Sequence, residues 1–275
     1  MRHDPDPPKQ LYVRGNPDVL HERRVAIVGT RQSTAYGRNI ARRMGAELAE
    51  AGVAVVSGLA IGIDGAAHEG ALAAGGAPIG VVATGLDVVY PRRHIRLWNE
   101  VGRNGLLLTE AEPGHRPSAR WNFPRRNRII AALAEIVVVV ESTVKGGSMH
   151  TVEAAMARGV DVMAVPGPVG SVVSEGTNRL LVDGVAPALG AEEVLIALNL
   201  TTTPRLFTEP KAPRVRVSSQ ARSVLAVLDF VSMPTDRLVT ESGMPRGQVL
   251  VALQELQAAG RAIGGGGWWS RVATA

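Results

Sequence analysis

Short apolar segments that alternate with helical patterns constrain the fold of this chain more than any other feature. From residue 25 onward, several segments of only a few residues are almost wholly apolar and rich in valine. Such segments lack the alternation of a half-buried strand and are typical of a parallel sheet that helices cover on both faces. They are Val25–Val28, Val53–Val56, Ile79–Ala83, Leu106–Leu108, Ile136–Val140 and Val162–Val165.

The segments between these strands carry helical spacing. Residues 36–51 place Ile40, Met44 and Leu48 on one face, and residues 63–74 form the next helical pattern. Strands that alternate with helices in this way build right-handed crossover units. The sequence therefore predicts an α/β protein with an extended Rossmann-like, doubly wound parallel sheet.

This pattern stops near residue 200 and a different one follows. Proline-rich residues 201–217 show no periodicity, which indicates a linker. Beyond them we expect helices at 223–231, 235–241 and 246–259 and a hairpin around a glycine turn at 261–272, which together suggest a winged helix. The predicted division is an N-terminal segment (1–21), a Rossmann-like domain (22–200), the linker (201–217) and a winged-helix domain (218–275).

Composition narrows the classes of function. The chain has 275 residues, a net charge of +5 and a sequence pI of about 10.2, which favour a polyanionic partner. It has no cysteine, so disulfides and thiolate chemistry are excluded. No apolar run approaches the roughly 20 residues that cross a bilayer, and the N-terminus is no signal peptide. We expect a soluble, cytoplasmic protein with no membrane partner.

Glycines beside hydroxyl and basic residues follow nearly every predicted strand. Ligands of a doubly wound sheet bind beyond the carboxyl ends of its strands, where glycine lets backbone N–H groups approach an anion. The first strand is followed by Gly29, Thr30 and Arg31, and the second by Ser57 and Gly58. The sequence thus predicts an anion site at this edge.

A cluster of arginines raises the question of what balances it. Arg125, Arg126 and Arg128 stand with Asn127 just before an apolar run that leads into a buried strand. A buried charge is costly unless it is paired. Either carboxylates of the chain itself, such as those of Glu110 and Glu141, pair with these arginines, or an external anion does.

A glycine-rich loop after the fifth of these strands offers further anion contacts. Lys145 is the only lysine between residues 22 and 200, and it is followed by Gly146, Gly147 and Ser148 at the start of a predicted helix. A lysine in such a loop is typical of a phosphate ligand. Because the arginine cluster comes from the neighbouring crossover, the two groups can flank one groove that tracks a nucleic-acid backbone.

Common nucleotide and metal chemistries lack their motifs. The first loop, GTRQSTAYG, is not G-x-G-x-x-G, and no G-x-x-x-x-G-K-[ST] occurs. The histidines show no ligand spacing. Asp64 and His68 share one helical face, but a structural role is favoured over a catalytic one, with Asp64 capping the helix and His68 bonded to a neighbouring loop. We expect neither a metal nor a cofactor.

Five ordered motifs resemble one family. SGLAIGIDGAAHEGAL, GLDVVYP, FPRRNRIIAAL, KGGSMHTVEAAMARG and VPG…SEGTNRLL occur in that order within residues 11–200. They resemble the DNA-processing protein A (DprA/Smf) family, and the tail is similar to that family's small winged-helix module. The resemblance implies a homodimeric protein, not known as an enzyme, that binds single-stranded DNA during natural transformation, protects it and loads the RecA recombinase.

The resemblance also implies a role for individual residues. The matching positions form a basic DNA pocket: Gly29, Thr30, Arg31, Ser57, Gly58, Arg126, Asn127, Arg128, Lys145, Gly146, Gly147 and Ser148, with Arg125 beside them. Many members have arginine where this chain has Ile61, and Arg31 or Arg125 would compensate for its loss. Two aromatic residues, Trp121 and Phe123, either stack on bases or plug the core.

Other functions remain open from the sequence. Gly146 to Glu153, GGSMHTVE, resembles the signature of nucleoside-monophosphate phosphoribohydrolases, in which Glu153 would be catalytic, although the central glycine is missing. A weaker alternative is a regulator that senses a nucleotide. The predicted third helix of the tail has only Arg246 as a base, so the tail binds either duplex DNA or a protein, including a second copy.

Overall fold

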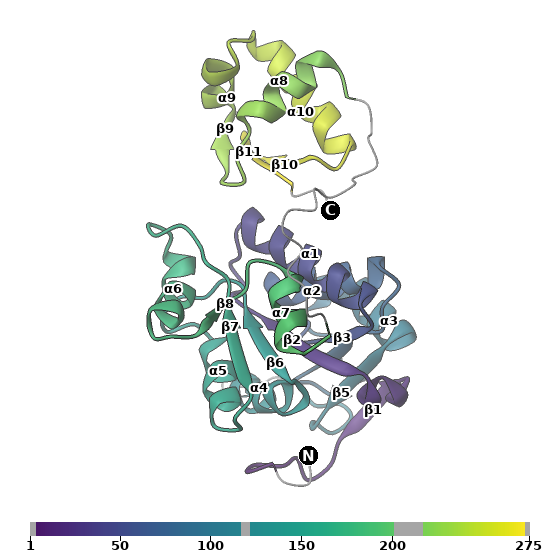
Figure 1. Ribbon diagram of the computed structural model, residues 1–275. Coiled ribbons are helices and arrows are strands. Elements are labelled where there is room, and N and C mark those ends of the chain that lie inside the picture. Colours follow the sequence, from purple (N-terminus) through teal and green to yellow (C-terminus); the bar gives the residue numbers. More distant parts are fainter. Residues whose placement is uncertain (1–3, 117–121, 201–216, 273–275) are drawn as a thin grey trace. The chain divides into compact units, whose positions relative to one another are not determined.

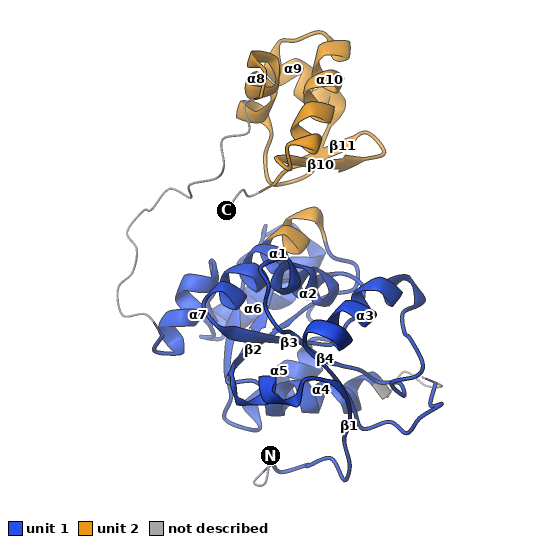
Figure 2. Ribbon diagram, turned by 90° about the vertical axis from the view of Figure 1, so that its right-hand side faces the viewer, with its two compact units in different colours: residues 1–33, 40–204 blue, residues 34–39, 205–275 orange. Residues whose placement is uncertain are grey.

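Two compact units make up the protein. A computed structural model describes residues 4–116, 122–200 and 217–272. The first unit comprises residues 1–33 and 40–204, and the second comprises residues 34–39 and 205–275 (Figure 2). Within the described ranges, no helix combines the length and the apolar character that crossing a membrane requires.

An eight-stranded sheet forms the centre of the first unit (Figure 1), in the order β1-β5-β4-β3-β2-β6-β7-β8. All pairs are parallel except β1 with β5. The chain runs outward from β2 in both directions, so the strand order reverses between β2 and β6. The strands are β1 (Tyr12–Gly15), β2 (Arg23–Val28), β3 (Val53–Ser57), β4 (Ile79–Val81), β5 (Leu106–Thr109), β6 (Ile136–Val139), β7 (Asp161–Ala164) and β8 (Ala186–Pro187).

Helices cover both faces of this sheet. Figure 2 shows α1, α2 and α3 on one face and α4 and α5 on the other. Trp98 of α3 is fully buried in one apolar cluster, and Ile129, Ile130 and Val152 of α4 and α5 pack in the other. The helices are α1 (Ala35–Glu50), α2 (Ile63–Ala73), α3 (Ile95–Asn104), α4 (Asn122–Leu133), α5 (Met149–Met156), α6 (Glu175–Val182) and α7 (Ala191–Ala197), with short 3-10 turns at Pro17–His21, Arg92–His94 and Val172–Ser174.

The predicted α/β class and its doubly wound sheet are confirmed, with one difference in detail. The segment 1–21 was expected to precede the domain, but Tyr12–Gly15 pairs with β5 and adds an antiparallel edge strand. The arginine cluster lies in helix α4, which forms the crossover between β5 and β6. Its first turns reach the ligand edge of the sheet, because α4 leads back from the end of β5 to the start of β6.

The second unit is a winged helix. Its helices α8 (Ser219–Val227), α9 (Thr235–Ser242) and α10 (Arg246–Ala258) enclose Val224, Leu238, Leu253 and Leu256, which are fully buried. A small sheet in the order β10-β11-β9 completes it, with β9 (Met233–Pro234), β10 (Ala262–Gly265) and β11 (Trp268–Arg271).

The first helix of this unit was predicted four residues too late. It begins at Ser219 instead of 223, because the Ser218 hydroxyl accepts the Ala221 N–H at 3.1 Å and caps it. Leu228 is already extended and ends the helix before the predicted 231. Most of the predicted linker, residues 201–217, lies outside the described residues.

Close contact of α1 with α2 depends on two glycines. A Cβ on Gly70 would lie 1.9 Å from the Arg42 carbonyl oxygen, and one on Gly45 would lie 2.3 Å from that of Ala67. The two backbones therefore touch where neither helix carries a side chain.

Gly70→Ala should destabilise the protein although the residue is helical. Alanine alone would favour the helix by up to about 1 kcal/mol, but forcing the helices apart costs about 1–3 kcal/mol. Denaturant unfolding should show a net loss. Gly170→Ala is the control, because a Cβ there meets open space. A Gly70→Ala protein as stable as the control would contradict the packing of α1 on α2.

Candidate nucleic-acid interface

A cleft of about 730 Å³ opens at the carboxyl ends of β2, β3 and β6, where the strand order reverses. Its walls come from the loop after β2, the first turn of α2, the start of α4 and the loop before α5. It brings together seven residues that the sequence predicted as a site: Gly29, Thr30, Arg31, Arg126, Asn127, Gly147 and Ser148. A doubly wound sheet binds ligands at this position.

Two smaller clefts adjoin the first. One of about 320 Å³ is lined by Glu110, His115 and Arg125, and one of about 40 Å³ is lined by Gly58, Tyr90 and others. Arg126 lines all three clefts. Ser57, Arg128, Lys145 and Gly146 lie outside their walls.

Arg126 is held from inside the protein. Its side chain is buried, and its guanidinium donates to the carbonyl oxygens of Gly58, at 2.6 Å, and Val81. Its Nε donates to Asn127 Oδ1 at 3.1 Å. Burial lowers the pKa of Arg126 to about 10, and the nearby Asp64 carboxylate opposes that shift. The group therefore remains a cation at neutral pH.

Gly58 makes room for this guanidinium. A Cβ at Gly58 would lie 2.4 Å from Arg126 Nη1, so only glycine lets the arginine reach the end of β3. The Gly58 N–H in turn donates to Asp64 Oδ2 at 3.1 Å. Burial raises the pKa of Asp64, and Arg126 acts against that rise. Asp64 therefore has a structural role, as preferred from the sequence, but it does not cap α2 as predicted. Gly62 is the N-cap residue, and Asp64 lies within the first turn and binds the loop before the helix.

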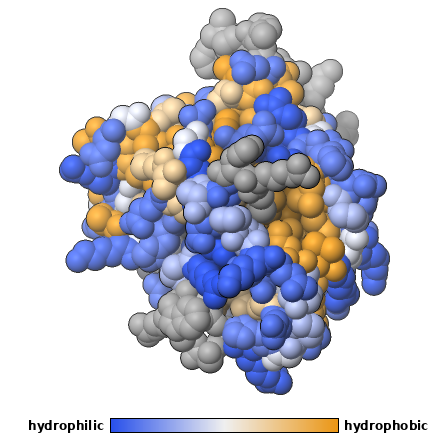
Figure 3. All heavy atoms as spheres, turned by 90° about the horizontal axis from the view of Figure 1, so that it is seen from below, coloured by the Kyte–Doolittle hydropathy of each residue, from blue (hydrophilic) through white to orange (hydrophobic). Residues whose placement is uncertain are grey.

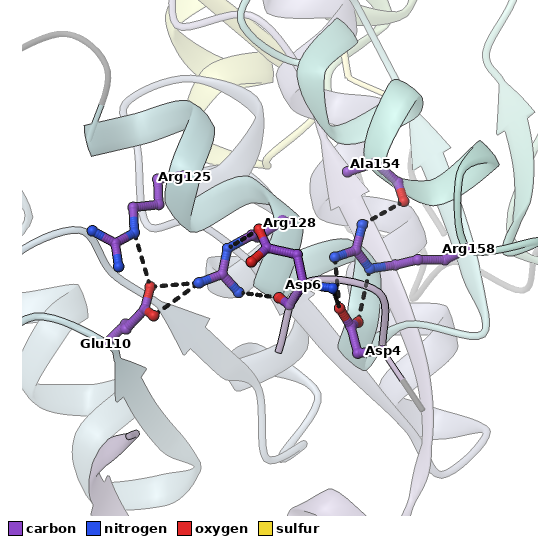
Figure 4. A network of polar contacts seen from close by, with 7 residues as sticks. All are labelled: Asp4, Asp6, Glu110, Arg125, Arg128, Ala154 and Arg158. Atoms are coloured by element: carbon purple, nitrogen blue, oxygen red, sulfur yellow. Dashed lines mark hydrogen bonds and ion pairs between the residues drawn. The ribbon is translucent and has the colours of Figure 1, made fainter. Parts of the chain in front are cut away.

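The two flanking arginines meet carboxylates of the chain (Figure 4). Arg128 Nη2 lies 2.8 and 2.7 Å from the two oxygens of Glu110, and its Nε lies 3.0 Å from Asp6. Arg125 Nε lies 3.3 Å from Glu110 as well, but 57% of the Arg125 side chain is exposed against 10% for Arg128. The internal alternative therefore holds for Arg128, and Arg125 keeps an accessible guanidinium.

The loop before α5 presents backbone groups and one lysine. Asn127 Nδ2 donates to the Gly147 carbonyl at 3.1 Å, which ties this loop to α4. The hydroxyl of Ser148 donates to that of Ser142 at 2.7 Å, so it is engaged inside the loop. Lys145 and Gly147 are exposed, and a Cβ at Gly147 would meet open space.

Ser57 does not face the ligand edge as the sequence suggested. It is the last residue of β3, fully buried, and its hydroxyl donates to the Ile27 carbonyl at 2.6 Å. The side chain points along the sheet toward the neighbouring strand β2 instead of into a cleft. Glu141 is buried too, and its carbonyl accepts the Thr30 N–H at 2.7 Å.

An aromatic pair borders the clefts. The Arg31 guanidinium lies 4.4 Å from the centre of the Phe123 ring, and Tyr90 lies 5.8 Å from Phe123 on another side. Phe123 is half-buried, so it is neither a core plug nor a free platform. Trp121 lies outside the described residues. Sequence reasoning did not select Tyr90, although its place in GLDVVYP, just after the loop that follows the third predicted strand, could have indicated it. Tyr90 and Ile61 both line the small cleft.

Sequence comparisons identify the family. The profile described as "DNA recombination-mediator protein A" matches residues 1–199, and "DprA winged helix domain" matches 208–267. The chain belongs to the DprA/Smf family. It is 37% identical to protein Smf of Escherichia coli over 93% of this chain and 69% of that protein. It is 41% identical to the DNA processing protein DprA of Streptococcus pneumoniae over 69% of this chain and 67% of that protein.

Two solved DprA structures resemble the first unit. The S. pneumoniae structure has a TM-score of 0.65 and 40% identity, covering 68% of this chain and 65% of that one. The Helicobacter pylori structure, described as showing a single-stranded DNA-binding mode, has a TM-score of 0.66 and 33% identity, covering 71% and 89%. The chain thus spans about two thirds of the length of most of these relatives.

A catalytic role for Glu153 does not fit this structure. The Glu153 side chain is 73% exposed, and it contacts His150 at 3.3 Å. It does not line the large cleft, although His150 and Thr151 do. A catalytic carboxylate needs a position against the reacting atoms, so the geometry disfavours the phosphoribohydrolase reading. In the described ranges, no cluster of three or more His, Asp or Glu side chains is arranged to hold a metal.

His68 carries a pH dependence of stability. Its ring is fully buried on α2, and among the described residues no hydrogen bond of ordinary geometry reaches either ring nitrogen. Burial lowers the pKa of His68 to about 3; the Ser57 backbone works against this shift, while His94 and Arg126 add to it. The predicted bond to a neighbouring loop is therefore weak at most, and the ring stays neutral.

Acidification should therefore destabilise the first unit through His68. The unfolded chain gains a proton near pH 6.5 and the folded one only near pH 3, so the stabilisation present above pH 6.5 is lost as pH falls. The loss is about 2 kcal/mol between pH 7 and pH 5. Guanidinium unfolding should show this slope, and His68→Gln should reduce it.

The exposed His150 provides the control. His150→Gln should retain the slope of the unaltered protein. The raised pKa of Asp64 makes the folded protein more stable as pH falls, which opposes the effect of His68. Asp64 is present in both variants, so its contribution largely cancels when their slopes are compared. Equal slopes for His68→Gln and His150→Gln would contradict a buried neutral His68.

Proposed function

We propose that this protein binds single-stranded DNA in the large cleft, through the phosphate backbone. The observation that carries the proposal is the gathering of Gly29, Thr30, Arg31, Asn127 and Gly147 around one cleft at the ligand edge of the sheet. The H. pylori relative described as binding single-stranded DNA supports it. Backbone N–H groups and arginine forks suit phosphate, and neither reads base sequence.

Exposed and buried cations have different roles in this proposal. Lys145, Arg125 and Arg31 supply direct phosphate contacts at the rim. Arg126 and Arg128 keep α4 in place, and Arg126 also adds positive potential to all three clefts. Phe123 and Tyr90 offer ring faces beside the backbone path, where stacking tolerates any base.

Family membership supports a proposal for the wider role. We infer that the protein acts without catalytic turnover or cofactor, in the cytoplasm, as a mediator that protects incoming single strands during natural transformation and loads RecA onto them. We also propose that it forms a homodimer. Exposed aliphatic side chains around α6 and α7 suit such a contact: Val169, Val172, Val182, Leu189, Ile196 and Leu200.

A protein contact is favoured over duplex DNA for the winged helix. Arg246, the base expected on α10, forms an ion pair with Asp236 at 2.5 Å. Leu250 and Val251 are exposed on the same helix. A helix that reads the major groove presents basic and polar groups, whereas this surface is neutral and partly apolar.

Lys145→Ala and Arg31→Ala should each weaken binding to oligo-dT. Each lost phosphate contact should make the slope of log affinity against log salt shallower by about 0.7. Fluorescence anisotropy across a salt series measures both effects. Arg126→Ala should also lower affinity, but with a fall in thermal stability, because that side chain is buried and bonded to two backbone carbonyls.

Arg179→Ala is the matched control for these variants. Arg179 is exposed on α6 and pairs with Asp183, so its loss removes one charge away from the cleft. Its slope should equal that of the unaltered protein. If Lys145→Ala and Arg31→Ala behaved like Arg179→Ala, the cleft would not be the DNA site.

A further inference from the structure

The first described residues of the chain cover a row of arginines on the outer side of α4 and α5. We call residues 4–6 the N-terminal strap, and Arg125, Arg128 and Arg158 the arginine strip. Asp4 binds Arg158 through both carboxylate oxygens at 2.8 Å. Asp6 binds Arg128 through its carboxylate at 3.0 Å and its carbonyl at 2.7 Å. Figure 4 shows these contacts side by side.

These pairs bury most of the strip. Only 9% of the Arg158 side chain and 10% of the Arg128 side chain are exposed. Arg158 follows α5, and its Nη1 also donates to the Ala154 carbonyl at 2.9 Å. Arg158 lines none of the three clefts. It lies in the KGGSMHTVEAAMARG motif, but sequence reasoning gave it no role. Its guanidinium is thus held by a carboxylate on one side and a backbone carbonyl on another, and the Asp4 side chain is itself only 5% exposed.

The strap is held chiefly through its charged groups. Pro5, Asp6 and Pro7 are exposed, and residues 4–11 form no helix or strand. A segment with few buried apolar contacts opens at low free-energy cost. An arginine fork binds carboxylate and phosphate in the same bidentate geometry. The strap therefore occupies the strip through two carboxylates, those of Asp4 and Asp6, which bind arginines as phosphates can.

The strip continues the proposed DNA path. Arg125 lines the second cleft together with Arg126, which also lines the large one. A strand that leaves the large cleft over the start of α4 meets Arg125, then Arg128, then Arg158. Glu110 contacts both Arg125 and Arg128, and these ion pairs involve no residue of the strap.

We propose that the arginine strip is a second phosphate-binding surface for single-stranded DNA and that the N-terminal strap competes for it. Asp4 and Asp6 take the positions of two backbone phosphates, and a strand long enough to reach the strip displaces them. This inference rests on the proposed function, because it extends the same DNA path. It adds Arg158 as a contact and the strap as an intramolecular competitor.

Removal of the two carboxylates tests the competition in the full chain. Asp4→Asn with Asp6→Asn should bind oligo-dT severalfold more tightly than the unaltered protein. Adding Arg158→Gln should abolish most of that gain. Asp18→Asn with Asp183→Asn is the control, because it makes the same charge change at two exposed positions away from the strip. Anisotropy at one salt concentration compares all four proteins.

Several outcomes separate the two proposals. Equal affinity of the strap and control pairs would overturn the competition while leaving DNA in the cleft. Absence of oligo-dT binding by every protein, including the unaltered one, would overturn the proposed function and this inference with it. Asp6→Asn alone is a variant that should fold normally, since 70% of the Asp6 side chain is exposed and the Asp4–Arg158 pair remains. It should show part of the gain in affinity for oligo-dT. Affinity equal to that of the unaltered protein would contradict the proposal.

Discussion

The contact of Arg126 with the ends of β3 and β4 is the constraint on which the candidate site depends. The guanidinium donates to the carbonyls of Gly58 and Val81, which lie at the ends of two neighbouring strands. It also balances Asp64, whose carboxylate holds the Gly58 N–H. Removing one member of a buried charge pair typically costs about 3–5 kcal/mol. The start of α4, and with it Asn127 and Phe123, is therefore fixed relative to the sheet edge.

A fixed edge matters because the walls of the adjoining clefts come from distant parts of the chain. Gly29–Arg31 follow β2, Gly58 follows β3, and Gly147 precedes α5. Asn127 connects α4 to the Gly147 carbonyl, and Glu141 connects β6 to Thr30. Donors that are already oriented lose little entropy when an anion binds. The polar contacts within the edge thus organise the groups that would face a DNA backbone.

Local patterns predicted the sheet well because a strand that is buried on both faces consists of consecutive apolar residues. Val25–Val28 and Ile136–Val140 are apolar since both of their faces are covered, and this needs no knowledge of partners. Side-chain direction was harder. Ser57 looked like a ligand for a cleft, but its hydroxyl bonds the adjacent strand. The pairing of Arg158 with Asp4 joins residues far apart in the sequence, and no spacing rule reveals such a contact.

The same limit explains the arginine cluster. Sequence reasoning recognised that Arg125, Arg126 and Arg128 need anionic partners and proposed Glu110 as an internal one, but it could not divide the three between inside and outside. Helical geometry turns Arg126 to a different face of α4 from the other two, because it lies one position from Arg125 and two from Arg128 on an axis with 3.6 residues per turn. Arg125 and Arg128 are three positions apart, so they lie on the same side and both contact Glu110. Arg126 consequently points to the sheet, Arg128 to Glu110 and the strap, and Arg125 toward solvent.

Arginines that are paired with carboxylates also affect how the protein would attract DNA over a distance. A charge already paired with a carboxylate contributes little to the long-range field, so steering depends on the unpaired or exposed cations. Arg128 and Arg158 are neutralised by Glu110, Asp6 and Asp4 until a competitor arrives. Initial attraction would then fall to exposed groups such as Lys145 and Arg125, and the buried forks would engage only a strand already in place. Such an order ties the strip to strands that have first entered the cleft, because only they lie close enough to compete with a tethered carboxylate.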